Sequence, residues 1–288
     1  MNIKKRYINL LTDYGFKKIF GDHVNKHLLL DFLNELFKDE QGEIRDLIYL
    51  KTEQLAFSRK DTADLCCKNE KGEIFIVGLR KSKHDFFSNR ERYCSSLPIW
   101  EQEKRGKWDF GLKAVYTVAI FNFAFDEDKD QPTKYRYDAK LSDIESKRVG
   151  YDKQTFIYLE MPKFTKGLEE LETGLDKWLY VIRNLHRLDK IPDKLRGKVF
   201  EQLFAAAEIA RFTPDQMRLY EKSLHYYHEM KKSLATQFAE GWDEGLKDEQ
   251  IEIALEMLGE GESVKKVADF TGLSLAVVKV LEHKRRQE

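Results

Sequence analysis

Apolar residues recur at helical spacing in the first part of the chain. The segment "NKHLLLDFLNELF", which begins at Asn25, repeats leucine and phenylalanine three and four positions apart, which predicts an amphipathic helix. A shorter helix is predicted before it, where Thr12 or Asp13 can cap a segment that ends at Phe20. Each of these helices has an apolar side with which it can cover a sheet.

The pattern then changes to one that favours strands. The runs "IRDLIYLKTEQLAF", "DTADLCCKN" and "IFIVGLR", with a turn at Gly72 before the last, predict a strand series with a tight reversal. Helical spacing returns from His84 to Arg105, with an interruption at Pro98. The nearly continuous apolar run from Lys113 to Phe125 predicts a central strand buried on both faces. Two further strands are predicted in "KYRYDAKL" and "TFIYLEM".

Beyond Pro162 the periodicity is helical almost throughout. We therefore predict three parts: a core in residues 1–162, a helical extension in residues 163–240 and a helical tail in residues 241–288. Gly241 and Gly245 lower the local helix propensity and predict a bend or hinge between the last two parts.

The tail segment "SVKKVADFTGLSLAVVKVLEHKRR" has the spacing of a helix-turn-helix, with Ser274 as the N-cap of its second helix. Two interpretations remain open. Such a motif can read DNA, but few basic residues stand at the start of its second helix, where base contacts are usually made. Alternatively, its apolar positions pack on the core or on a second protomer. Packing on a second protomer would make the protein a homo-oligomer.

Composition excludes several classes of protein. Of the 288 residues, 42% are hydrophobic, which suits a folded chain, and 50 basic residues balance 50 acidic ones, so any polyanion site must be a local patch. The first residues lack the apolar core of a signal peptide, and no segment is long and apolar enough for a membrane span, so we expect a cytoplasmic protein. Three cysteines, among them the adjacent Cys66 and Cys67, form no metal-ligand spacing and predict ordinary, partly buried thiols.

One group of residues is placed where a catalytic site could form. Asp64 is predicted on one strand, and Gly78 and Arg80 on the next strand across the Gly72 turn. Residues two apart on a strand share a face, so positions 78 and 80 are expected to meet Asp64 across the pair. A divalent cation at such a place needs oxygen ligands and would activate water against a phosphodiester, but one carboxylate alone is a poor Mg²⁺ site.

Several ordered blocks of the sequence carry a family resemblance. They are "LTDYGFKKIFG", "NKHLLLDFLNELF", "RKDTADLCCKNEKGEIFIVGLRKSKHDFFSNRERYCS", "WDFGLKAVYTVAIFNF" and "EGWDEGLKDEQIEIALEMLGEGESVKKVADFTGLS". Together the blocks resemble the PD-(D/E)XK nuclease family transposases, also called recombination-promoting nucleases. The resemblance implies an α/β restriction-endonuclease-like core followed by an α-helical C-terminal extension, a Mg²⁺ cofactor and a DNA substrate.

The family motif places an aspartate on one strand and a Glu-x-Gln or Glu-x-Lys fourteen residues later. Asp64 matches the aspartate and would be the surviving metal ligand, whereas Gly78 stands where the family has glutamate and Arg80 where it has glutamine or lysine. Glycine removes a ligand, and arginine adds a fixed positive charge near the cation. The same arginine can offer two hydrogen bonds to a phosphate, which predicts a site that holds DNA without cutting it.

Other residues can support or restore this site. Glu91 on the following helix, or Asp61 in the chain before Asp64, can replace the lost ligand, although a solvated surface charge is the simpler interpretation of Glu91. Asp13 and Lys17 match the family's N-terminal D-x-x-F-K pattern and either support the metal site or act as a helix cap and a surface ion pair. A phosphate-facing patch or a solvated helix face is predicted for the segment that contains Lys81, Lys83, Arg90, Arg92 and Tyr93.

Two functions from different classes therefore follow from the sequence. The first is a DNA endonuclease of the recombination-promoting type, with metal-dependent hydrolysis impaired by Gly78 and Arg80. The second is a non-catalytic module that binds DNA or a protein on a degenerate nuclease scaffold. Metal-dependent cleavage distinguishes the first from the second.

Overall fold

A computed structural model describes residues 5–38, 42–50, 64–81, 113–125, 131–143, 145–146 and 148–285. By its internal contacts the chain divides into two units, Met1–Leu224 and His225–Glu288. The three-part division expected from the sequence stays a prediction.

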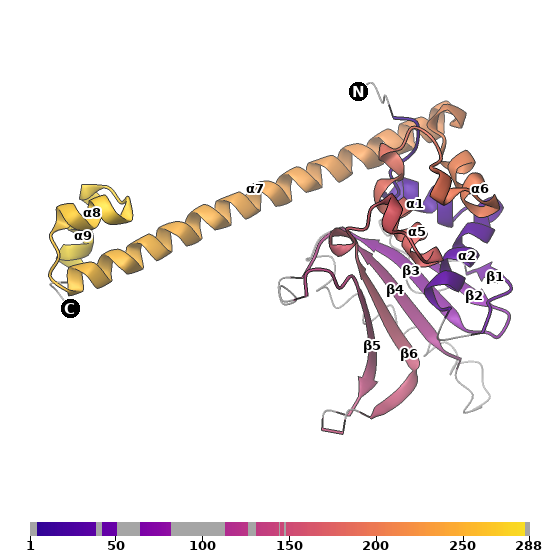
Figure 1. The fold of residues 1–288 in the computed structure, drawn as a ribbon, viewed down its shortest axis with the longest axis horizontal. Helices are drawn as coiled ribbons and strands as arrows, with labels where there is room; N and C mark the ends of the chain where they lie inside the picture. Colours follow the sequence, from indigo (N-terminus) through magenta and orange to yellow (C-terminus); the bar gives the residue numbers. More distant parts are fainter. Residues whose placement is uncertain are drawn as a thin grey trace. The chain divides into compact units, whose positions relative to one another are not determined.

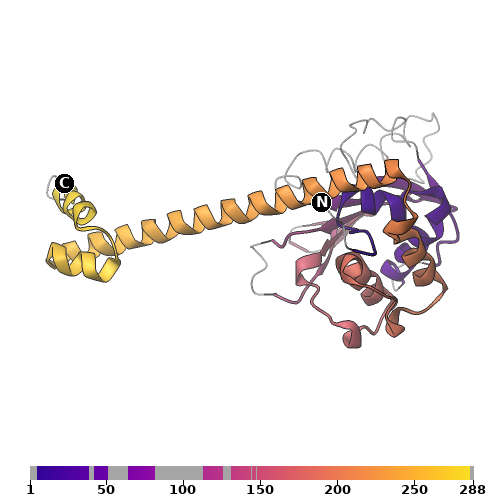
Figure 2. The same ribbon diagram turned by 90° about the horizontal axis from the view of Figure 1, so that it is seen from above.

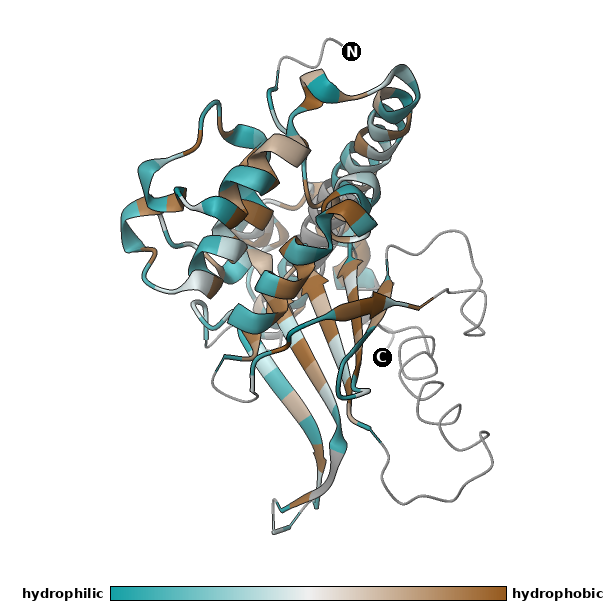
Figure 3. Ribbon diagram, turned by 90° about the vertical axis from the view of Figure 1, so that its right-hand side faces the viewer, coloured by the Kyte–Doolittle hydropathy of each residue, from teal (hydrophilic) through white to brown (hydrophobic). Residues whose placement is uncertain are grey.

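The described strands of the first unit form one mixed sheet in the order β1-β2-β3-β4-β6-β5. Their bounds are β1 Leu47–Tyr49, β2 Leu65–Asn69, β3 Ile74–Arg80, β4 Val115–Phe121, β5 Arg136–Ser142 and β6 Val149–Glu160. Strands β3, β4 and β6 run parallel to one another, while β1, β2 and β5 pair antiparallel with their neighbours. Every residue of β3 and β4 is buried, as their apolar sequences predict, and brown hydrophobic residues colour the central strands in Figure 3.

Four helices cover one face of this sheet (Figures 1 and 2). They are α1 Asp13–Phe20, α2 Lys26–Leu36, α5 Gly174–Asn184 and α6 Lys198–Ala207. Trp178 of α5 packs against Phe20 and Phe32 at centroid distances of 5.7 Å, and Phe37 after α2 packs edge-on against Phe75 of β3 at 5.6 Å. These aromatic contacts join the helices to each other and to the sheet, which gives the α/β core expected from the sequence.

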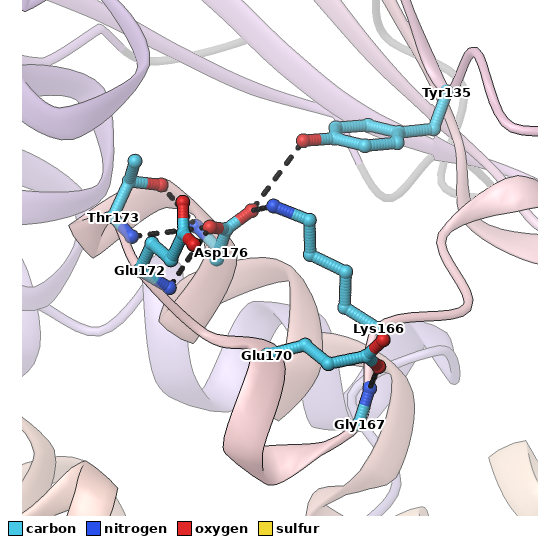
Figure 4. A network of polar contacts seen from close by, with 7 residues as sticks. All are labelled: Tyr135, Lys166, Gly167, Glu170, Glu172, Thr173 and Asp176. Carbon is cyan, nitrogen blue, oxygen red and sulfur yellow. Dashed lines mark hydrogen bonds and ion pairs between the residues drawn. The ribbon is translucent and has the colours of Figure 1, made fainter.

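A buried polar network fixes the start of α5 (Figure 4). The Thr173 side chain accepts a hydrogen bond from the backbone N–H of Asp176, and the Asp176 carboxylate accepts one from the N–H of Thr173, which is a reciprocal capping box. Lys166 donates to the same carboxylate at 2.9 Å, and the Tyr135 hydroxyl lies 3.4 Å from it. Burial alone would raise the pKa of Asp176, but the hydrogen bonds from Lys166 and the backbone hold that pKa below its usual value.

Helix α7, Pro214–Gly259, is continuous through Gly241 and Gly245, and the bend or hinge expected at these glycines stays a prediction. Two glycines each cost only about 1 kcal/mol of helix propensity, and the neighbouring alanine, glutamate and lysine residues favour the helix. Among the described residues, no helix is both long and apolar enough to cross a lipid bilayer.

The second unit contains most of α7 and two short helices, α8 Val264–Thr271 and α9 Leu275–Arg285. Gly272 between them has a φ of 75°, a left-handed conformation that suits glycine and ends α8. Ala254, Leu258, Val267 and Val278 form a small core shared by the three helices. The predicted pair of helices around Thr271-Gly272 is therefore present, and Ser274 accepts a hydrogen bond from the N–H of Val277 at the start of the second one.

Candidate functional site

The candidate site lies on the β2–β3 hairpin, on the sheet face opposite to the four helices. The antiparallel register pairs Leu65 with Val77 and Cys66 with Ile76, so Asp64, directly before β2, stands opposite Gly78. Arg80 lies two residues farther along β3 and shares this face. The structure thus brings together Asp64, Gly78 and Arg80, whose separation along the sequence first indicated a site.

Asp64 and Arg80 form an ion pair. Nη1 of Arg80 donates to Oδ1 of Asp64 at 2.6 Å, and Nη2 lies 3.4 Å from Oδ2. Nη1 also donates to the backbone carbonyl of Leu79 at 3.0 Å. The Arg80 side chain is 10% exposed and that of Asp64 is 19% exposed, so water screens the pair only weakly. Arg80 therefore makes with Asp64 the bidentate contact that the sequence analysis predicted with a phosphate.

The glycine at position 78 makes room for this pair. A Cβ atom at Gly78 would lie 1.8 Å from Oδ1 of Asp64 and 2.6 Å from Nη1 of Arg80, both far inside van der Waals contact. The Asp64 carboxylate therefore occupies the volume that any side chain at position 78 would need. Gly78 and Arg80 are thus parts of one arrangement, because the glycine leaves free the space in which Arg80 binds Asp64.

The residues of this arrangement do not fit a magnesium ion. Mg²⁺ requires oxygen ligands, but Gly78 has no side-chain oxygen and both Asp64 oxygens face the guanidinium of Arg80. A cation that bound Asp64 would have to displace the guanidinium of Arg80, which stays protonated and positively charged. Within the described ranges, no three histidine, cysteine, aspartate or glutamate side chains gather closely enough to hold a metal ion. The replacement ligands proposed from the sequence, Glu91 and Asp61, lie outside the described residues.

A second ion pair joins helix α1 to the end of β3. Lys81, which follows Arg80, donates a hydrogen bond to Oδ2 of Asp13. Asp13 is not the helix cap considered from the sequence, because Thr12 takes that place and its hydroxyl oxygen accepts from the N–H of Gly15 at 3.1 Å. Lys17 lies exposed on α1. Asp13, like Asp64, therefore pairs with a basic residue at the end of β3.

The predicted DNA-binding patch lies almost entirely outside the described part of the chain. Of its five members only Lys81 is described, and its side chain is 11% exposed because it is held against Asp13. The others are Lys83, Arg90, Arg92 and Tyr93. Their role stays a prediction.

The sequence interpretation missed a buried acidic residue on the same sheet face. Glu160 ends β6, and the parallel registers place it in one row with Phe121 and Arg80. Its side chain is fully buried, Oε2 lies 2.9 Å from Nζ of Lys163, and Oε1 has no hydrogen-bond partner in the described part of the chain. Burial opposes the charge of Lys163, yet bonds to Tyr137 and Glu160 outweigh it and raise the Lys163 pKa. The sequence pattern that could have predicted this buried pair is a glutamate at the end of an apolar strand, followed by a lysine three residues later.

Comparison with known proteins identifies a family for most of the chain. Residues 10–237 match the family model described as PD-(D/E)XK nuclease family transposase. No curated protein and no solved structure matches the chain. The matched region covers most of the chain, including the β2–β3 hairpin, helix α1 and the sheet strands that follow. The chain therefore belongs to the PD-(D/E)XK nuclease family transposases.

Proposed function

We propose that this protein binds DNA but does not cut it in a magnesium-dependent reaction, because the Asp64–Arg80 ion pair stands where its family holds a metal ion. The single observation that carries the proposal is the bidentate contact between these side chains above Gly78. Membership in a nuclease family supports DNA as the ligand.

Electrostatics supports the loss of cleavage. The pair is neutral as a whole, so Asp64 no longer offers an uncompensated negative charge to a dication. Binding a metal there would leave the Arg80 guanidinium poorly hydrated and beside a second positive charge. Separating a poorly solvated ion pair costs about 3–5 kcal/mol, and the metal would have to supply that energy from a site with one carboxylate.

Two finer predictions accompany this function. The cytoplasmic location and the role in DNA recombination expected from the sequence both stay predictions. The phosphate contacts are assigned to the basic segment of Lys83, Arg90 and Arg92, since Arg80 and Lys81 are engaged with Asp64 and Asp13.

The test measures cleavage and binding separately with the full chain. Supercoiled plasmid is incubated with the protein in Mg²⁺, in Mn²⁺ and in EDTA, and binding of a fluorescent duplex is followed by anisotropy under the same conditions. We expect no nicking, and a Kd that changes with Mg²⁺ to the same extent in the parent protein and in Asp64→Ala. Because phosphate contacts release counterions, the Kd should rise steeply with salt.

Asp64→Ala and the matched surface variant Asp193→Ala serve as controls, since the Asp193 side chain is 86% exposed. Nicking that disappears in Asp64→Ala and persists in Asp193→Ala would refute the proposal and identify the protein as an active nuclease. Absence of DNA binding under all conditions would refute the proposal that the protein binds DNA.

Self-association through the C-terminal helices is a second proposal. Helices α8 and α9 expose large apolar side chains: Phe270 is 72% exposed, Leu275 51% and Val280 56%. Apolar residues in the first turn of α9 suit a protein partner better than base edges. Light scattering should show an oligomer that Phe270→Ser with Val280→Ser shifts to monomer, whereas a monomeric parent protein would exclude this contact.

A further inference from the structure

The sheet face that carries Asp64 and Arg80 is partly open over β6 and β5. On β3 and β4 the residues of this face, such as Ile76 and Thr117, are at most 9% exposed. On β6 the residues of the same face, Gln154, Phe156 and Tyr158, are only half-buried, although their neighbours toward the helices are buried. The burial of this face therefore decreases from β4 to β6.

The open part of the face is aromatic. The Phe156 and Tyr158 rings lie 6.2 Å apart with 30° between their planes, and the Phe121 ring continues the series 5.5 Å from Tyr158. Tyr137 of β5 stands directly opposite Tyr158 in the antiparallel register. We call Tyr137, Phe156 and Tyr158 the aromatic face.

Lysine side chains lie at the edge of this aromatic face. Nζ of Lys134, an exposed residue, lies 4.6 Å above the Tyr137 ring, and Nζ of Lys163 lies 5.3 Å from the same ring and donates to the Tyr137 hydroxyl at 3.0 Å. Glu160 balances the charge of Lys163 at 2.9 Å. Lys134 has no acidic partner at ion-pair distance among the described residues. Half-exposed rings beside a lysine suit a ligand that combines flat apolar surfaces with negative charge.

The aromatic face lies on the same side of the sheet as the candidate site. The parallel registers place Tyr158, Ala119 and Gly78 in one row across β6, β4 and β3. Adjacent strands are about 4.8 Å apart, so Tyr158 stands roughly 10 Å along the sheet from Gly78. The buried strand β4 lies between them, so a ligand on the aromatic face does not need to contact the Asp64–Arg80 pair.

We propose that the aromatic face binds single-stranded DNA, with unpaired bases stacked on Phe156 and Tyr158 and a phosphate near Lys134. The proposal rests on the proposed DNA-binding function and narrows its ligand to DNA with unpaired bases. Paired bases are stacked on each other inside a duplex and cannot lie flat on these rings. Exposed rings on a sheet are suited to this type of recognition, because every base offers a flat face.

The experiment uses the full chain and three probes: fluorescent oligo(dT), a fluorescent duplex of equal charge, and an oligonucleotide with one 2-aminopurine, whose fluorescence falls when the base stacks on a ring. We expect tighter binding of the single strand and quenching of 2-aminopurine. Phe156→Leu should weaken single-strand binding about 5- to 140-fold, whereas Phe156→Tyr, which keeps a ring, should retain it. Tyr226→Leu is the matched control, since Tyr226 is an exposed aromatic residue of α7.

Lys134→Gln separates charge from stacking. It should lower the salt dependence of single-strand binding by the contribution of about one phosphate contact and leave the quenching of 2-aminopurine in place. Equal binding of both DNA forms, with no effect of Phe156→Leu, would overturn this inference and leave the proposed function intact. No binding of either form would overturn both.

Discussion

A methyl group added at position 78 should break the Asp64–Arg80 pair. In Gly78→Ala the new Cβ would lie 1.8 Å from Oδ1 of Asp64, so the carboxylate must rotate away from the guanidinium. Breaking a buried ion pair costs about 3–5 kcal/mol. The lower end of this range applies because the Asp64 side chain is 19% exposed and is therefore partly hydrated. Replacement of glycine by alanine also restricts the unfolded chain, which returns about 0.4–1 kcal/mol. The free energy of unfolding should therefore fall by about 2–3 kcal/mol.

The assay is urea unfolding followed by tryptophan fluorescence and circular dichroism, since Trp178 lies in the core of the first unit. Gly167→Ala is a matched control, because a Cβ there would meet Glu170 at an ordinary distance of 3.4 Å and the φ of Gly167 is −78°. That variant should stay within about 0.5 kcal/mol of the parent protein.

A double-mutant cycle tests whether the two positions act through one ion pair. Arg80→Met removes the guanidinium, and the Asp64 carboxylate is then free to rotate when alanine is placed at position 78. The loss in the double variant should be smaller than the sum of the single losses by about 1–3 kcal/mol. Additive losses, or a Gly78→Ala protein as stable as the parent, would refute the conclusion that Asp64 occupies the space above Gly78.

Two further predictions concern the scaffold. Thr12→Val should lower the free energy of unfolding by about 1–2 kcal/mol in urea titrations, because the buried hydroxyl both accepts from Gly15 and donates to the Asn9 carbonyl at 2.7 Å; an unchanged midpoint would contradict that role. The folded-state pKa of Asp176 is lowered, so its contribution to stability is complete above the unfolded pKa of about 3.9 and is lost as the pH falls through the folded value. Asp176→Asn should therefore destabilise the protein at pH 7 by more than at pH 3, and an equal loss at both values would show that the carboxylate charge does not matter.

Sequence reasoning located the candidate site but not its chemistry. The apolar run of β3 and the turn at Gly72 were sufficient to predict Asp64, Gly78 and Arg80 on one face, because residues two apart on a strand share a face and the turn sets the strand register. The partner of Arg80 could not be predicted, because it depends on the volume that a missing side chain leaves free. Sequence spacing offers no measure of that volume.

Glu160 and the aromatic face were missed for a different reason. They lie on the same sheet face as the candidate site because β6 pairs in parallel with β4. No local sequence pattern specifies the order of strands that are joined by long connections. Gly241 and Gly245 lie within a continuous helix because glycine propensity is a weak predictor and the residues around both glycines favour a helix.

The central claim is that the Asp64–Arg80 pair replaces a metal site, and calorimetric titration of Mn²⁺ tests it most directly. The parent protein should give the same heats as Asp64→Ala. The variant that combines Gly78→Glu with Arg80→Gln removes the guanidinium and adds a second carboxylate, and it should gain a binding event that Asp64→Ala abolishes. Mn²⁺ binding by the parent protein that is lost in Asp64→Ala would contradict the account.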